Sequence, residues 1–95
     1  SWFFMMYKIE FDDEAKKTIA KLKKSNPQTF KKVTKLLEDI ALHPRTGIGH
    51  PEPLKGGADI TYSRHIKGND RIIYDIYDDI VSVLIVSAEG HYDDK

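Results

Sequence analysis

Two stretches of helical periodicity that meet at an Asn-Pro junction constrain the fold more than any other feature of this sequence. The apolar positions are Ala15, Ile19 and Leu22 in the first stretch and Phe30, Val33, Leu37 and Ile40 in the second. Asn26 followed by Pro27 is typical of a helix start, with asparagine as N-cap and proline at the first helical position. Asp12 or Asp13 caps the first helix, and Pro44 ends the second. Two helices joined this tightly predict an antiparallel hairpin.

Short strands are predicted on both sides of this hairpin. Tyr7 to Phe11 alternates apolar and charged residues, which indicates a strand. Three more strands follow the hairpin, at Ile60 to Ile66, Arg71 to Tyr77 and Ile80 to Ala88. The last of these is apolar on both faces, so we expect it in the middle of the sheet. The order β-α-α-β-β-β predicts an α+β fold, with the helical hairpin packed on one face of a twisted, mainly antiparallel sheet.

The length of 95 residues predicts a single domain, residues 1–95, with a thin core that a partner protein could partly cover. Met5 and Met6 are candidate native starts, and we expect residues 1–5 to be non-native or disordered. The chain has no cysteine, which excludes disulfides and suits the cytoplasm. The longest apolar run, Ile80 to Val86, is far shorter than the ~20 residues of a membrane helix. No membrane association is therefore expected.

The charge balance gives little support for binding nucleic acid. Fifteen lysines and arginines are matched by fifteen aspartates and glutamates, so the formal net charge is zero. Proteins that bind nucleic acid usually carry a basic excess. Only a local concentration of positive charge would favour such a function.

A loop rich in glycine and proline, residues 45–59, carries the first candidate functional residue. Long loops in compact domains are often functional. Glu52 lies between Pro51 and Pro53, which restrict the backbone and hold the carboxylate in place. The carboxylate suits a general base, whereas the simpler interpretation is a solvated loop glutamate.

Cationic side chains on two neighbouring strands form a second candidate site. On the first of them Tyr62, Arg64 and Ile66 share one face, and Ser63 and His65 share the other. Hairpin pairing brings Arg64 or His65 close to Arg71 on the next strand. Such a pair predicts a phosphate clamp, because the planar fork of arginine suits phosphate oxygens. The simpler alternative is ordinary surface charge.

His91 and Tyr92 follow the last strand and form a third candidate. Histidine titrates near neutrality and can act as an acid, and a tyrosine ring can stack on a base. A histidine near the terminus is, by contrast, often inert. No histidine pair or carboxylate cluster has the spacing of a metal site, so neither metal nor other cofactor is predicted.

The order of these motifs resembles the YoeB branch of the RelE toxin superfamily. The similar blocks are His50-Pro51-Glu52-Pro53-Leu54-Lys55, Tyr62-Ser63-Arg64-His65-Ile66, Asp70-Arg71-Ile72-Ile73-Tyr74 and Gly90-His91-Tyr92. The resemblance runs from about Tyr7 to Tyr92. It implies a small bacterial endoribonuclease that cuts mRNA in the A site of the ribosome without a metal. A cognate antitoxin of the YefM type, and a homodimer or a toxin–antitoxin hetero-complex, are implied as well.

The resemblance also implies a role for each site residue. Glu52 matches the general base, His91 the general acid, Arg71 the phosphate-binding arginine and Tyr92 the tyrosine that positions the substrate. Lys55 and Arg64 match basic residues of the family's RNA-facing surface. Together with His65 they are the predicted substrate-binding residues.

Three departures from the family pattern bear on the strength of the activity rather than on its kind. His65 stands where a second arginine is expected, which weakens the clamp or makes it dependent on pH. The acidic tail Asp93-Asp94-Lys95 extends past Tyr92 and opposes the approach of phosphate. The neutral net charge also differs from the basic character expected of a ribosome-binding toxin.

Two other functions remain as alternatives. One is a ParE-like toxin of the same fold that inhibits DNA gyrase without catalysis, which would not need Glu52 and His91 together. The other is a degraded toxin that serves only as an antitoxin-binding module, which His65 and the acidic tail favour.

Overall fold

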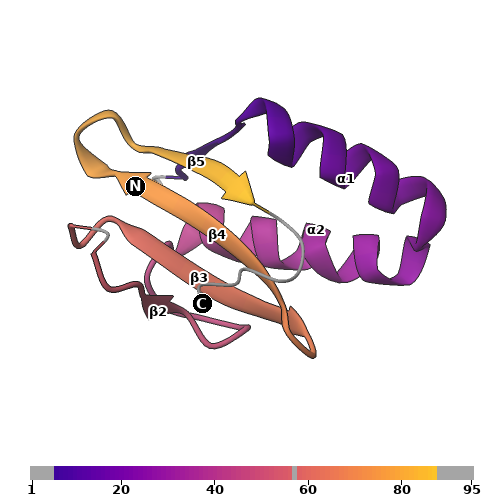
Figure 1. The fold of residues 1–95 in the computed structure, drawn as a ribbon. Coiled ribbons are helices and arrows are strands. Elements are labelled where there is room, and N and C mark those ends of the chain that lie inside the picture. Colours follow the sequence, from indigo (N-terminus) through magenta and orange to yellow (C-terminus); the bar gives the residue numbers. More distant parts are fainter. Residues whose placement is uncertain (1–5, 57, 88–95) are drawn as a thin grey trace.

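The computed structural model describes residues 6–56 and 58–87, and it begins with the predicted helical hairpin (Figure 1). Helix α1 covers Asp13–Ser25 and helix α2 covers Pro27–Leu42. The Asp12 carboxylate caps α1 by accepting the Ala15 N–H at 3.0 Å. The Asn26 side chain caps α2 by accepting the Thr29 N–H at 3.2 Å, with Pro27 in the first turn. The predicted junction is confirmed, because one residue ends α1 and starts α2.

Five strands form one sheet in the order β1-β5-β4-β3-β2. Their bounds are Lys8–Phe11 for β1, Glu52–Pro53 for β2, Thr61–Lys67 for β3, Asp70–Tyr77 for β4 and Ser82–Ser87 for β5. Strand β1 runs parallel to β5, and the other neighbours are antiparallel. The predicted central place of the last strand is confirmed, since β5 lies between β1 and β4.

Two local features differ from the prediction. The predicted loop contains β2, a two-residue strand that is too short to show an alternating pattern. The predicted turn before the last strand is a 3-10 helix at Asp78–Ile80, and Val81 follows it in the left-handed conformation with φ of 49°. The last strand therefore starts later than its apolar pattern suggests.

Both helices pack against the same face of the sheet (Figure 1). The buried core lies between these two layers and consists of Ala15, Val33, Leu36, Ile40, Ile66, Ile72, Tyr74, Ile76, Val83 and Ile85. Side chains that alternate with the strand residues of this core point to the opposite face. The register assigns Glu52, Ser63, His65 and Arg71 to that opposite face, which we call the far face.

Several predictions fall outside the described residues. These concern residues 1–5, the predicted catalytic residues His91 and Tyr92, and the tail at 93–95. Among the helices that the structure describes, none is long and apolar enough to cross a membrane.

Candidate active site

Backbone pairing fixes the position of Glu52. Its Cα partner across the β2–β3 pair is Ser63. On one side of this pair the Leu54 N–H donates to the Thr61 carbonyl at 2.9 Å. On the other side the His65 N–H donates to the Gly49 carbonyl at 2.7 Å. The segment that carries Glu52 is therefore bonded to β3 at both ends, while the Glu52 side chain is exposed.

Arg71 lies on the same face, one strand further into the sheet. It is the register partner of His65 across the β3–β4 pair. Its Nη1 donates a long hydrogen bond of 3.4 Å to Ser63 Oγ. Within the described ranges no aspartate or glutamate forms an ion pair with Arg71. A half-buried guanidinium without a carboxylate partner has donors left for an anion.

Ser63 connects these side chains, and sequence reasoning missed it. It is fully buried, lies opposite Glu52 in the register and accepts the Arg71 hydrogen bond. Its alternation with His65 was visible in the sequence, but a serine in a strand carries no chemical signal of its own. On the far face Glu52 thus lies in the register position next to Ser63, and Arg71, the register partner of His65, reaches the Ser63 hydroxyl diagonally.

Two of the predicted substrate-binding residues, Lys55 and His65, make no side-chain hydrogen bond to Glu52, Ser63 or Arg71 in the part of the chain that the structure describes. Lys55 is exposed in the turn after β2. His65 is half-buried, and its ring centroid lies 6.1 Å from that of His50. The roles assigned to Lys55 and His65 stay predictions.

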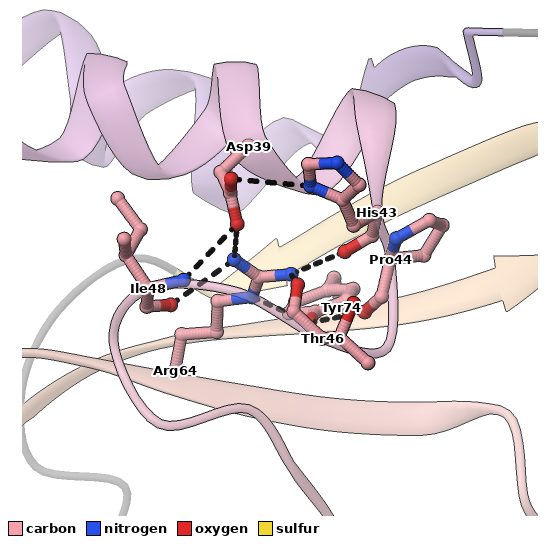
Figure 2. Close-up of polar contacts among 7 residues, drawn as sticks. All are labelled: Asp39, His43, Pro44, Thr46, Ile48, Arg64 and Tyr74. Atoms are coloured by element: carbon pink, nitrogen blue, oxygen red, sulfur yellow. Dashed lines mark hydrogen bonds and ion pairs between the residues drawn. The ribbon is translucent and has the colours of Figure 1, made fainter.

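The predicted place of Arg64 on an RNA-facing surface is wrong. Arg64 is fully buried, with 0% of its surface exposed. The alternation of β3 turns it to the helix-covered face, where its guanidinium bonds to Asp39 on α2 and to the carbonyl of His43 at the end of this helix. Figure 2 shows its guanidinium enclosed by the residues that connect α2 to the loop. Arg64 is therefore unavailable to a phosphate.

All five N–H groups of the Arg64 guanidinium have acceptors. Nε donates to the Tyr74 hydroxyl at 3.0 Å, and Nη1 donates to the Asp39 carboxylate at 2.5 Å. The remaining donors bond to the carbonyl oxygens of His43, Thr46 and Ile48 (Figure 2). The Tyr74 hydroxyl in turn donates to the Pro44 carbonyl at 2.7 Å. We call this set the Arg64 network, and it fixes the loop that leads to β2.

Asp39 and Gly47 complete the network. Asp39 Oδ2 accepts the Ile48 N–H at 3.1 Å as well as the Arg64 bond, so Ile48 is held through both its backbone groups. Gly47 has φ of 121°, and a Cβ added there would collide with the Asp39 carboxylate. Glycine is therefore required at this turn, for its conformation and for its missing side chain.

The charges within the network shift the pKa values of its members. Burial raises the pKa of Asp39, but hydrogen bonds from Arg64 and the Ile48 N–H, with the Arg64 charge, lower it to a net value below 3.8. Burial also raises the pKa of the Tyr74 hydroxyl above its ordinary value, although Arg64 opposes this. Asp39 is thus an anion, and Tyr74 a neutral donor, throughout the physiological range.

No metal centre is visible among residues 6–56 and 58–87. In these ranges no three histidine, aspartate or glutamate side chains are grouped so as to hold a metal ion. A mechanism without a metal stays a prediction.

Comparison with known proteins places this geometry in a family context. Residues 11–92 match the model of the YoeB-like toxin of bacterial type II toxin–antitoxin systems. The toxin YoeB of Streptomyces coelicolor is 40% identical over 68 residues, which cover 72% of this chain and 79% of that protein. The YoeB dimer from Staphylococcus aureus superposes with a TM-score of 0.80 at 30% identity, covering 92% of this chain and 99% of that one. The toxin in a heterotetrameric YoeB–YefM toxin–antitoxin complex from the same organism superposes with a TM-score of 0.78 at 30% identity. This match covers 90% of this chain and 98% of that one.

Proposed function

The chain belongs to the YoeB-like toxin family of bacterial type II toxin–antitoxin systems, and on that premise we propose that it is a metal-independent endoribonuclease that cleaves mRNA in the ribosomal A site. The observation that carries the proposal is the far face. There Glu52 and Arg71 flank Ser63, and Arg71 has no carboxylate partner among the described residues.

The reaction follows from the requirements of RNA cleavage. The Glu52 carboxylate takes the proton of a ribose 2′-hydroxyl, whose oxygen then attacks the adjacent phosphorus. The bond from phosphorus to the 5′-oxygen breaks, leaving a 2′,3′-cyclic phosphate on one fragment. His91 gives its proton to the departing 5′-oxygen. The other, downstream fragment therefore begins with a 5′-hydroxyl. Arg71 stabilises the charge that builds on the phosphate oxygens, and Tyr92 stacks on a base.

We further propose that a YefM-like antitoxin silences the chain and that the toxin forms a dimer. The relatives from Staphylococcus aureus form a dimer in one structure and a heterotetramer with YefM in another. An antitoxin segment that folds on binding would cover the far face and keep RNA from Arg71. Hydrogen exchange with and without antitoxin tests this. Protection is expected across β3 and β4, and unchanged exchange both there and at residues 91–92 would contradict occlusion.

The activity is tested by adding the purified protein to a translating extract and mapping the mRNA ends. Glu52→Gln keeps the size of the side chain but removes the base, so we expect cleavage to fall by about 10²–10⁴-fold. Glu38→Gln is the matched control, because Glu38 is exposed on α2, away from the far face. Equal cleavage by the wild type and Glu52→Gln would contradict the role of Glu52. Inhibition of gyrase without any cut mRNA would favour the ParE-like alternative.

A further inference from the structure

A basic hollow lies between α2, the loop before β2 and the outer edge of β3. Its volume is about 410 Å³. Lys32 and Lys35 line it from α2, His50 from the loop and His65 from β3. No aspartate or glutamate lines it among the described residues. Its apolar lining comes from Leu36, Ile48 and Ile66.

Local structure brings these side chains together. Lys32 and Lys35 are three residues apart on α2, so they project from the same side of the helix, and both are exposed. His50 has φ of 58°, a conformation that few residues other than glycine adopt. The preceding Gly49 is bonded to the His65 N–H, and this contact brings the two imidazole rings to a centroid distance of 6.1 Å. The loop therefore holds His50 beside His65 at the edge of the sheet.

The hollow adjoins the candidate active site. His65, which lines the hollow, is the register partner of Arg71 on β4. Among the described residues, side chains able to bind anions thus extend from Arg71 through His65 to Lys32 and Lys35. This is the local concentration of positive charge that the neutral net charge conceals.

We propose that the basic hollow binds single-stranded RNA next to the phosphate held by Arg71. The proposal rests on the proposed function, since it extends the same site. The lysine and histidine side chains would bind a backbone phosphate, and the apolar lining would contact the attached nucleoside. A volume of about 410 Å³ is near the lower end of the ~300–1,000 Å³ typical of ligand sites, so it suits one nucleotide rather than a duplex.

The test measures the affinity for a short 2′-O-methyl oligoribonucleotide, which cannot be cut because the attacking hydroxyl is blocked. The variant replaces both Lys32 and Lys35 with glutamine, a good helix former. We expect binding about fivefold weaker at low salt. The slope of log affinity against log salt should become shallower by about 0.7, because the variant loses one phosphate contact and each such contact on a single strand contributes about 0.7.

The matched control replaces Lys16 and Lys17, which are exposed on α1 and do not line the hollow. It removes the same charge, so an equal loss of affinity would show an effect of net charge alone and overturn the proposal. Unchanged binding by the variant in Lys32 and Lys35 would overturn it too. His50→Asn is a second variant, because asparagine tolerates a positive φ. It should weaken binding without changing the thermal unfolding temperature by more than about 2 °C.

A second arm distinguishes two sources of the phosphate. If the loss appears with the free oligoribonucleotide, the hollow binds the mRNA strand. If it appears only with intact ribosomes, the bound phosphate belongs to ribosomal RNA, and the proposal that the hollow binds the single strand beside Arg71 is overturned. An effect on antitoxin affinity alone, with RNA binding unchanged in both arms, would overturn the proposal. Because the oligoribonucleotide is not cleaved, these results do not depend on whether the protein is a nuclease.

Discussion

Arg64 and Arg71 lie on neighbouring strands of the sheet but on opposite faces, and their surroundings differ in every respect. Arg64 is fully buried, with five hydrogen bonds and an ion pair to Asp39. Arg71 is half-buried and, within residues 6–56 and 58–87, makes one hydrogen bond, a long one to Ser63. A guanidinium whose donors are all used stabilises a fold, whereas one with spare donors can bind an anion. The face of the strand, and not the residue type, decides which of the two roles an arginine has.

The largest expected effect is a loss of folding stability when Arg64, on the helix-covered face of the sheet, is replaced. Arg64→Met fills a similar volume but leaves Asp39 and three carbonyl groups without their donor, which should lower the free energy of unfolding by about 3–5 kcal/mol. Urea unfolding followed by circular dichroism measures this. Arg64→Lys should recover only part of the loss, because an ammonium group cannot reach acceptors in five directions.

Arg71→Met is the matched control for that measurement. Its unfolding free energy should stay within about 0.5 kcal/mol of the wild type, as for most substitutions outside the core. If Arg64→Met cost less than about 1 kcal/mol, or if both variants lost stability equally, the contrast between the two faces would fail.

The second effect concerns activity on the far face. Arg71→Ala should lose about 2–4 kcal/mol of transition-state stabilisation, as when other preorganised charge donors are removed. Single-turnover cleavage measures it. Arg71→Lys should regain only part, since lysine lacks the planar fork. Cleavage by Arg71→Lys at the wild-type rate would argue against a bidentate contact.

The third expected effect is a pH dependence of the free energy of unfolding, which comes from Asp39 on the helix-covered face. The folded pKa of Asp39 lies below 3.8, so its contribution to stability is present above this value and is lost as the pH falls through the folded pKa. Asp39→Asn should cost about 1.5–3 kcal/mol near neutral pH, the range for hydrogen bonds to charged groups. Urea unfolding at several pH values should show the difference between the wild type and the variant shrink as the pH falls below the ordinary titration range of an aspartate. A difference that stays constant over the whole acidic range in which the wild type folds would contradict the assigned charge.

The helices and the central strands were predictable from sequence because local patterns determine them. Asn26-Pro27 marks the junction, and the apolar run at 80–88 indicates an interior strand of the sheet. The two-residue strand β2 was not predictable, since it forms only by pairing with β3. The same limit applies to Arg64. Its face follows from alternation with Tyr62 and Ile66, but its acceptors come mostly from backbone carbonyls of a loop, which no residue pattern encodes.

The sequence resemblance predicted which residues form the site. The structure showed which face of the sheet each of their side chains occupies. Glu52 and Arg71 share the far face, as a common site requires. Ser63 became visible only through the strand register. The predicted clamp of Arg64 or His65 with Arg71 reduces to His65, because Arg64 is turned to the helices.

The smallest effect is expected from placing at position 65 the arginine that the sequence resemblance leads us to expect there. His65→Arg should place a second permanent cation opposite Arg71, and RNA affinity should rise about threefold, as for a single exposed charge pair. The gain should shrink as the salt concentration rises. Affinity at two salt concentrations checks it, and weaker binding by His65→Arg would show that the imidazole makes a contact that an arginine cannot replace.

The central claim is that side chains of the far face cut RNA through its own 2′-hydroxyl, and the chemistry of the cut ends tests it most directly. Ribosome complexes programmed with a labelled mRNA are treated with the wild-type protein, and both new ends are analysed by mass spectrometry. We expect a 2′,3′-cyclic phosphate on the upstream fragment and a 5′-hydroxyl on the downstream fragment, with neither formed by Glu52→Gln. A 3′-hydroxyl paired with a 5′-phosphate would show that water or a metal-bound hydroxide is the nucleophile, and would contradict the claim.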